Sequence, residues 1–116
     1  NPDLACPTLY GFMPDCGAIC RLIISAVGRE PAYIGKPDPT MIRLALEQTG
    51  CAAEEALMVG DRLYTDIACG RNAGVDTVLV LTGEATAADA AASSTPPTLI
   101  CRDMAELLAR IREAQT

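Results

Sequence analysis

The sequence predicts an α/β fold in which a parallel β-sheet is flanked by helices. Short apolar runs alternate along the chain with stretches of helical periodicity, which is typical of βαβ units. Residues 77–81 form a nearly continuous apolar run, as expected for a parallel strand that is covered on both faces. A second apolar run, residues 56–59, stops at Gly60 and Asp61. The carboxylate of Asp61 therefore lies just beyond the carboxyl end of a predicted strand, where open α/β sheets bind ligands.

The first part of the chain is expected to contribute one helix and one strand. Residues 1–15 are predicted to be loop-like, because prolines and a glycine punctuate them. Apolar residues then recur at helical spacing, which predicts a helix over residues 17–27 that ends at Gly28. Residues 31–34, with the sequence Pro-Ala-Tyr-Ile, predict a short strand.

The remaining sequence alternates between helices and strands with short connections. Asp38 is placed to cap the first of these helices, and Gly50 to end it. In the last helix, Leu107, Leu108 and Ile111 share one stripe and are expected to face inward. The predicted helices cover residues 39–48, 65–72, 85–92 and 104–114, and the predicted strands cover residues 56–59, 77–81 and 98–101.

Composition limits the classes of partner. A chain of 116 residues supports one small domain, and half of its residues are hydrophobic, as in an ordinary packed core. The formal net charge of −6 argues against a nucleic-acid partner, which would require a basic surface. No apolar run is as long as a transmembrane helix and no signal peptide is visible. We therefore expect no membrane partner and a cytoplasmic location.

The six cysteines do not form a metal-binding or disulfide pattern. There is no Cys-x-x-Cys pair and no histidine, so a zinc site built from Cys6, Cys16 and Cys20 is disfavoured. A disulfide framework is also unusual in an alanine-rich α/β sequence. The favoured interpretation is six reduced cysteines, several of them small buried hydrophobic residues.

Three charged residues are the strongest candidates for a site. Lys36 is the only lysine among nine cationic residues, which suggests a position that requires a compact point charge rather than a planar guanidinium. Asp61 follows the predicted strand, and Asp66 lies at the start of the next helix. Both acids also have structural interpretations, since Asp61 could satisfy turn amides and Asp66 could be a favourable acid in a first helical turn.

Several segments together resemble the haloacid dehalogenase superfamily. They are Gly35-Lys36-Pro37, Val59–Ile67, Ala73-Gly74 and Val78–Gly83. The resemblance covers residues 1 to about 85 and is closest to the branch of 4-nitrophenyl phosphatases and nucleotide or sugar phosphatases. It implies a Rossmann-like core, with residues 1–30 as the C-terminal remnant of a cap domain and residues 31–116 as the C-terminal half of the hydrolase core.

The resemblance also implies roles for individual residues. Asp61 and Asp66 would supply part of a Mg²⁺ site, and Lys36 would stabilise the negative charge of the attacking aspartate and of the phosphate. Asn1 and Asp3 would face the mouth of the active site and contact the substrate. The family's nucleophile lies in an Asp-x-Asp motif that this sequence lacks and that precedes Asn1 in the family order. The chain is thus expected to be part of a Mg²⁺-dependent phosphatase for small phosphorylated metabolites, acting through an aspartyl-phosphate, and to be inactive alone.

Two other functions remain open from the sequence. A phosphorelay receiver domain also places an aspartate and a hydroxyl after neighbouring strands, as Asp61 and Thr82 are placed here, but its lysine follows a later strand. A non-catalytic, self-associating fragment is the other alternative. Without the nucleophile strand, residues 56–59 would form an exposed apolar sheet edge, which favours pairing with a second copy in a homodimer.

Overall fold

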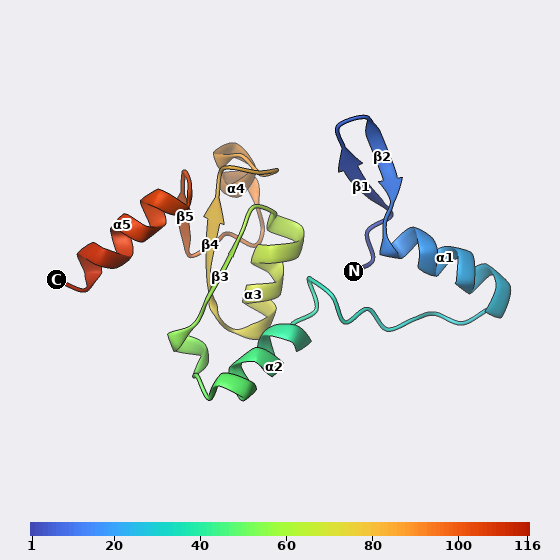
Figure 1. Cartoon of the computed structure of the whole chain (residues 1–116), viewed down its shortest axis with the longest axis horizontal. Coiled ribbons are helices and arrows are strands. Elements are labelled where there is room, and N and C mark those ends of the chain that lie inside the picture. Colours follow the sequence, from blue (N-terminus) through green and yellow to red (C-terminus); the bar gives the residue numbers. More distant parts are fainter. The chain divides into compact units, whose positions relative to one another are not determined.

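The computed structural model describes residues 1–116 as two compact units, Asn1–Gly35 and Lys36–Thr116 (Figure 1). The first unit contains a β-hairpin and one helix, and the second contains a three-stranded sheet with its helices. None of the helices combines the length and the apolar character needed to cross a membrane. The division falls beside Lys36, so the lone lysine is the first residue of the second unit.

A hairpin replaces the loop that was predicted for residues 1–15. Strands β1 (Ala5–Thr8) and β2 (Gly11–Pro14) pair antiparallel, with Cys6 opposite Met13. The prediction was wrong because prolines are tolerated in a hairpin, where both strands are edge strands and not every N–H is needed for pairing. Gly11, with a φ of 127°, allows the chain to reverse between the strands.

Helix α1 (Cys16–Val27) confirms the predicted helix. The Asp15 carboxylate accepts a hydrogen bond from the Cys16 N–H at 2.7 Å, and Gly28 ends the helix in the left-handed conformation. The strand predicted for residues 31–34 is wrong, since this segment has no regular secondary structure. Pro31 has no N–H to donate, and no strand of the chain pairs with the segment.

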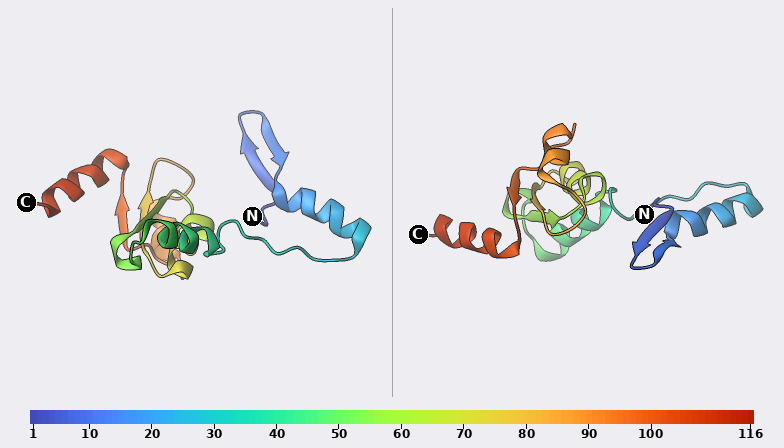
Figure 2. Two further views of the ribbon diagram at one scale, coloured as in Figure 1. Left: turned by 60° about the horizontal axis from the view of Figure 1, so that its bottom comes forward. Right: turned by 90° about the horizontal axis from the view of Figure 1, so that it is seen from above.

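The second unit is built on a parallel sheet in the order β3-β4-β5, which confirms the predicted α/β class (Figures 1 and 2). Helix α3 packs against β3 and β4, α2 packs against α3, and α5 contacts β5. The strands are β3 (Leu57–Gly60), β4 (Asp76–Val80) and β5 (Leu99–Cys101). The helices are α2 (Thr40–Thr49), α3 (Ala68–Ala73), α4 (Ala87–Ala92) and α5 (Met104–Ala114), and a short 3₁₀ turn spans Ala53–Glu55.

The central strand β4 separates two hydrophobic clusters. Leu79 packs with Ile67, Ala85 and Ala90, while Val78 and Val80 pack with Cys101 and Leu107 on the other side. Because successive strand residues point to opposite faces, this alternation covers both faces of β4, as its apolar sequence predicted. Strand β4 is therefore the best-buried element of the chain.

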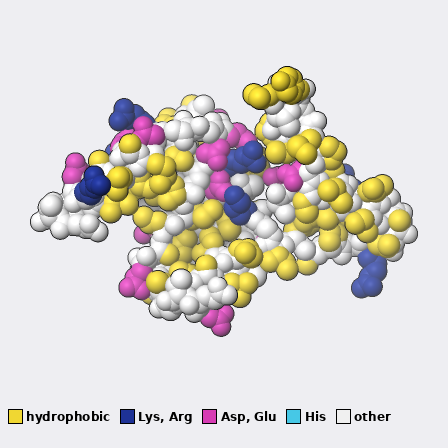
Figure 3. Space-filling model, viewed as in Figure 1, with side chains coloured by type: hydrophobic (Ala, Val, Ile, Leu, Met, Phe, Trp, Pro, Cys, Tyr) yellow, Lys and Arg dark blue, Asp and Glu magenta, His cyan; other side chains and the backbone are white.

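Helix α5 is less buried than its sequence predicted. Leu107 is buried, but Leu108 and Ile111 are 47% and 39% exposed, so the expectation for these two residues was wrong. The short strand β5 offers little surface to the helix beyond its first turns. Hydrophobic side chains are also exposed elsewhere on the face shown in Figure 3.

Candidate active site

The candidate site lies in the turn that follows β3. The strand ends at Gly60, Asp61 and Arg62 form the exit, and the chain then enters a π-helical turn over Leu63–Ile67 before α3. The Arg62 carbonyl accepts hydrogen bonds from the N–H groups of both Asp66 and Ile67, each at 3.1 Å. The helical path therefore begins at Leu63 rather than at the predicted Thr65. Such π-helical turns are frequent at functional sites.

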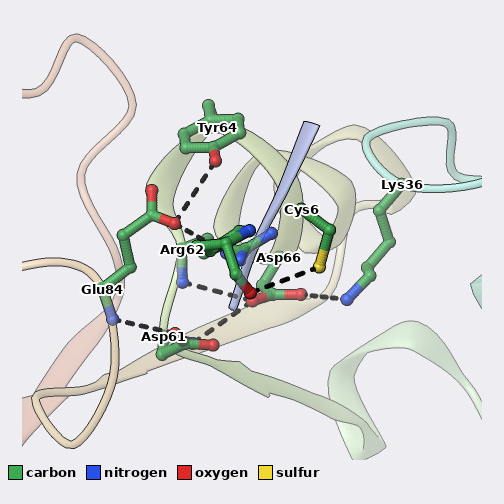
Figure 4. A network of polar contacts seen from close by, with 8 residues as sticks. Cys6, Lys36, Asp61, Arg62, Tyr64, Asp66 and Glu84 are labelled. Atoms are coloured by element: carbon green, nitrogen blue, oxygen red, sulfur yellow. Dashed lines mark hydrogen bonds and ion pairs between the residues drawn. The ribbon is translucent and has the colours of Figure 1, made fainter. Parts of the chain in front are cut away.

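Asp66 is the buried centre of this turn. One carboxylate oxygen, Oδ2, accepts hydrogen bonds from the backbone N–H groups of Asp61 and Arg62, each at 3.2 Å. The other, Oδ1, forms an ion pair with Lys36 Nζ at 2.5 Å (Figure 4). Asp66 is only 4% exposed. Both of its oxygens are therefore engaged, and the carboxylate fixes the turn while it holds the lysine.

Lys36 is held at the site by its charge, and the two residues that follow it are anchored by their backbone carbonyls. The carbonyl of the next residue, Pro37, accepts a hydrogen bond from Asn72 Nδ2 at 3.0 Å, and the Asp38 carbonyl accepts one from the Cys69 thiol at 3.2 Å. These contacts tie the loop that carries Lys36 to helix α3. Burial raises the pKa of the Cys69 thiol, which favours the protonated donor, although Lys36 partly opposes this. The lysine side chain itself is 51% exposed, so its ammonium can also meet an anionic ligand.

Asp61 has one oxygen engaged and one available. Its Oδ2 accepts a hydrogen bond from the Glu84 N–H at 2.9 Å, and its backbone carbonyl accepts one from Ala85 at 3.0 Å. No hydrogen bond to Oδ1 is present. The turn after β3 is thus tied to the segment after β4, and Asp61 retains a free acceptor at the carboxyl ends of both strands.

Two glycines make room for the two carboxylates. A Cβ added to Gly60 would lie 2.2 Å from Asp66 Cβ, and one added to Gly83 would lie 2.0 Å from Asp61 Oδ2. Real Cβ atoms do not approach other atoms so closely. Any larger residue at either position would displace the carboxylate beside it.

The rim of the site includes residues that were not predicted from the sequence. Arg62 Nε pairs with Glu84 Oε2 at 2.9 Å, and the Tyr64 hydroxyl donates a hydrogen bond to the same oxygen at 3.4 Å (Figure 4). Glu84 and Gly83 follow the strand next to β3. Their position after a neighbouring parallel strand was the signal that could have identified them, because adjacent carboxyl ends meet at one edge of a sheet.

The donor set fits part of a hard-cation site. A Mg²⁺ ion takes six oxygen ligands and usually keeps several waters, with one or two carboxylates from the protein. Asp61 Oδ1 is an available carboxylate oxygen of this kind, whereas both Asp66 oxygens are already bonded. No group of three or more acidic, cysteine or histidine side chains is arranged to hold a metal. These residues therefore offer one carboxylate oxygen, Asp61 Oδ1, that is available to a cation.

The remaining predicted site residues, Asn1 and Asp3, lie in the first unit. The Asn1 side-chain oxygen accepts a hydrogen bond from the Asp3 N–H at 3.1 Å, so the two residues are ordered with respect to each other. Lys36, Asp61 and Asp66, by contrast, are brought together within the second unit.

The sequence matches a family of known enzymes. The family model described as HAD-hydrolase-like matches residues 33–107. A dihydroxyacetone phosphatase of Corynebacterium glutamicum is 41% identical over 107 residues, which are 92% of this chain and 39% of the relative. An acid sugar phosphatase of Staphylococcus aureus is 40% identical over 113 residues, which are 97% of this chain and 44% of the relative. The chain thus spans about two fifths of the length of these curated relatives.

Solved structures of the same type resemble the fold. A 4-nitrophenylphosphatase from Thermotoga maritima superimposes with a TM-score of 0.82 at 42% identity, covering 91% of this chain and 41% of that protein. A glycerol phosphate phosphatase from Mycobacterium tuberculosis, solved in complex with magnesium, gives a TM-score of 0.82 at 37% identity and covers 92% of this chain and 32% of that protein.

Proposed function

Because this chain belongs to the HAD-like hydrolase family, we propose that it is part of a Mg²⁺-dependent phosphatase that acts on small phosphorylated metabolites. The intact enzyme would attack the phosphate with an aspartate, form an aspartyl-phosphate and hydrolyse it. That nucleophile would come from a segment outside residues 1–116, since this sequence has no Asp-x-Asp motif. The named activities of the relatives, which act on sugar, dihydroxyacetone and glycerol phosphates, support this class of substrate.

The observation that carries the proposal is the bonding around Asp66. Its carboxylate joins the only lysine of the chain to the backbone of Asp61. Phosphoryl transfer depends mainly on positioning and on charge stabilisation. Lys36 would neutralise charge on the attacking aspartate and on the phosphate oxygens, and Asp66 would keep its ammonium in place.

Asp61 and Asp66 have different roles in the proposed metal site. Asp61 would bind Mg²⁺ directly through Oδ1, the oxygen without a hydrogen bond. Asp66 would act by holding the N–H groups of the turn and Lys36, and so would support the metal indirectly. When bound, Mg²⁺ supplies charge stabilisation and orientation of the phosphate.

The first unit would contribute to substrate choice. We assign residues 1–30 to a remnant of the cap domain and residues 31–116 to the core, with Asn1 and Asp3 as substrate contacts. The observed division between compact units, at Gly35 and Lys36, falls close to this boundary. The cytoplasmic location stays a prediction.

The test is an assay of a longer protein that joins residues 1–116 to the family's nucleophile segment. We expect Mg²⁺-dependent release of phosphate from dihydroxyacetone phosphate, glycerol phosphate or 4-nitrophenyl phosphate. Lys36→Met should reduce kcat/KM by about 10²–10³-fold, as expected when a charge-stabilising group is lost. Arg112→Met, which removes an exposed cation from α5, is the matched control and should leave the rate unchanged.

Residues 1–116 alone should not turn over 4-nitrophenyl phosphate, because the nucleophile is absent. Robust hydrolysis by a pure preparation of this chain would contradict the proposed mechanism. The phosphorelay alternative is set aside because the matched family is a family of hydrolases.

Self-association is a second candidate property of the isolated chain. Strand β3 is an end strand of the sheet, and Leu57 on it is 51% exposed. A groove of about 270 Å³ between α2 and β3 is lined by apolar residues that include Ile42, Leu46 and Met58. An open apolar edge favours pairing with a second copy. Light scattering at tens of micromolar should give the mass of a dimer, and a monomeric mass would reject this candidate.

A further inference from the structure

A pair of thiols shares one face of helix α1, outside the candidate active site. Cys16 and Cys20 are four residues apart, and their sulfur atoms lie 4.0 Å from each other. Cys16 is exposed and Cys20 is half-buried. Side chains at i and i+4 of a helix are neighbours, so the backbone of α1 presents both sulfurs in the same direction.

The separation of the two sulfurs suits a single bridging ion. Thiolate sulfur binds a metal such as zinc at about 2.3 Å, and bond angles between tetrahedral and trigonal then place two sulfurs about 3.8–4.0 Å apart. The observed separation of 4.0 Å between the two sulfurs lies at the upper end of this range. Two thiolates of the folded helix can therefore reach one ion with little change in the backbone.

Oxidation of the same pair to a disulfide is opposed by the helix. A disulfide needs Cβ atoms about 3.5–4.5 Å apart, whereas Cβ atoms at i and i+4 of a helix are about 5–6 Å apart. Closing that bond would require α1 to unwind locally. The folded helix therefore favours two free thiols over a disulfide.

The surroundings of Cys20 suit a ligand with an apolar substituent. Burial, followed by the nearby Cys20 thiol, raises the pKa of Tyr33, which favours a protonated hydroxyl near the sulfur. Cys20 also lines a small pocket of about 140 Å³, whose apolar side is formed by Ile23, Ile24 and Pro31 and whose other side is formed by the charged residues Arg29 and Glu30. The apolar part of a group bound to the thiols would pack against this apolar side of the pocket.

We propose that Cys16 and Cys20 form a two-thiolate binding site for one soft, thiophilic metal or metalloid ion. This site is separate from the Mg²⁺ chemistry of the second unit, because soft ions prefer thiolate ligands and Mg²⁺ prefers oxygen. It goes beyond the proposed phosphatase function and does not depend on it.

Phenylarsine oxide is the probe for this site. Its arsenic condenses with two thiols, so that two As–S bonds form and the As–O bond breaks. The oxygen leaves with both thiol protons as one water, and arsenic stays trivalent. The product therefore carries the mass of the probe minus one water, which intact-mass spectrometry measures directly.

The experiment uses the reduced 116-residue chain with excess glutathione as a competing monothiol. The chain should form one adduct that resists the competitor, and Cys16→Ser or Cys20→Ser should weaken retention by at least about tenfold, since a single thiol loses the chelate. Cys51→Ser removes an exposed thiol of the second unit and is the matched control. An adduct retained by both Cys16→Ser and Cys20→Ser, or one lost in Cys51→Ser, would overturn the proposal.

A second measurement distinguishes a site that the folded helix preforms from two cysteines that chelate the probe in an unfolded chain. Two cysteines four residues apart can also chelate arsenic in an unfolded chain, but there both side chains must be ordered on binding. We expect about tenfold weaker retention in urea than in the native protein. Circular dichroism should show that the native adduct keeps its helix. Equal retention in the two states, or loss of helix on binding, would contradict the role given to α1.

Discussion

Two carboxylates of the second unit are held by similar bonds in very different surroundings. Asp66 accepts two backbone N–H groups and the Lys36 ammonium, and its side chain is 6% exposed. Glu106 in α5 accepts the Arg102 N–H and the guanidinium groups of Arg102 and Arg110, and its side chain is 21% exposed. Buried polar groups are costly to leave unpaired, whereas surface ion pairs contribute little.

The comparison shows that the same type of bonding has different consequences in the two places. At Asp66 the bonds fix a turn that presents a second carboxylate, and they hold the ammonium of a lysine from a separate loop. At Glu106 they link the first turn of an exposed helix to the next turn through Arg110 and to the residue before the helix cap, Arg102, through i,i+4 pairs. The structure therefore predicts that changes near Asp66 affect both stability and activity, and that changes near Glu106 affect stability slightly.

The largest effect on stability is expected from Asp66→Asn. The amide cannot accept from Lys36 and from the two backbone N–H groups together, so the loss should be about 2 kcal/mol in the free energy of unfolding. Urea denaturation of the 116-residue chain measures this change. Glu47→Gln on the exposed face of α2 is the matched control and should stay within about 0.5 kcal/mol of the parent. Equal effects of the two substitutions would contradict the stabilising role given to the bonds of Asp66.

A smaller and more local effect is expected from Gly83→Ala. The added methyl group would displace Asp61 Oδ2 from its position beside Gly83. Mutating a group that orients a metal ligand typically lowers metal affinity by about tenfold or more. We therefore expect the Gly83→Ala variant of the longer protein to bind Mg²⁺ about tenfold more weakly than the parent. Calorimetric titration with Mg²⁺ checks this, with Glu54→Gln on the exposed 3₁₀ turn as the control. Unchanged affinity in Gly83→Ala would show that Asp61 does not contact the ion.

The smallest effect is expected from Glu106→Gln, and it should depend on pH. The Arg102 N–H, followed by the Arg110 and Arg102 guanidinium groups, lowers the pKa of Glu106 from 4.5 to about 2. A carboxyl whose pKa is lowered by folding stabilises the protein above its unfolded pKa, and this contribution is lost as the pH falls through the folded value.

Glu106→Gln should therefore melt at a lower temperature than the parent, and this difference should be largest near neutral pH. It should shrink as the pH falls from 4.5 toward 2. Thermal unfolding across this range measures it. A difference that grows on acidification would contradict the assigned bonding.

The sequence predicted the sheet better than the connections. The runs at residues 56–59 and 77–81 are close to the observed β3 and β4, because a buried parallel strand leaves a continuous apolar signal. The hairpin of β1 and β2 was missed, since exposed strands that contain prolines leave no such signal. The predicted strand at residues 31–34 failed for the complementary reason, because strand-like residues form a strand only where a partner is available.

Three charged residues of the candidate site, Lys36, Asp61 and Asp66, were singled out from the sequence, but their bonding was not predicted. The lone lysine and the two acids after β3 were visible in the sequence. That Asp66 is enclosed while Asp61 keeps a free oxygen could not be predicted, because it depends on a π-helical turn and on contacts over 30 residues of sequence separation. Glu84 and Gly83 were missed because their relation to Asp61 exists only once β3 and β4 are paired.

A double-mutant cycle on the longer protein tests the central claim that Lys36 and Asp61 act on one phosphate-and-metal pocket. Steady-state kcat/KM is measured for Lys36→Met, Asp61→Asn and the double variant. If the two residues serve one transition state, the double variant should lose little more than the more damaging single variant, since groups that act as a unit are strongly non-additive. Losses that simply multiply in the double variant would mean that the two side chains act independently, and would contradict this account.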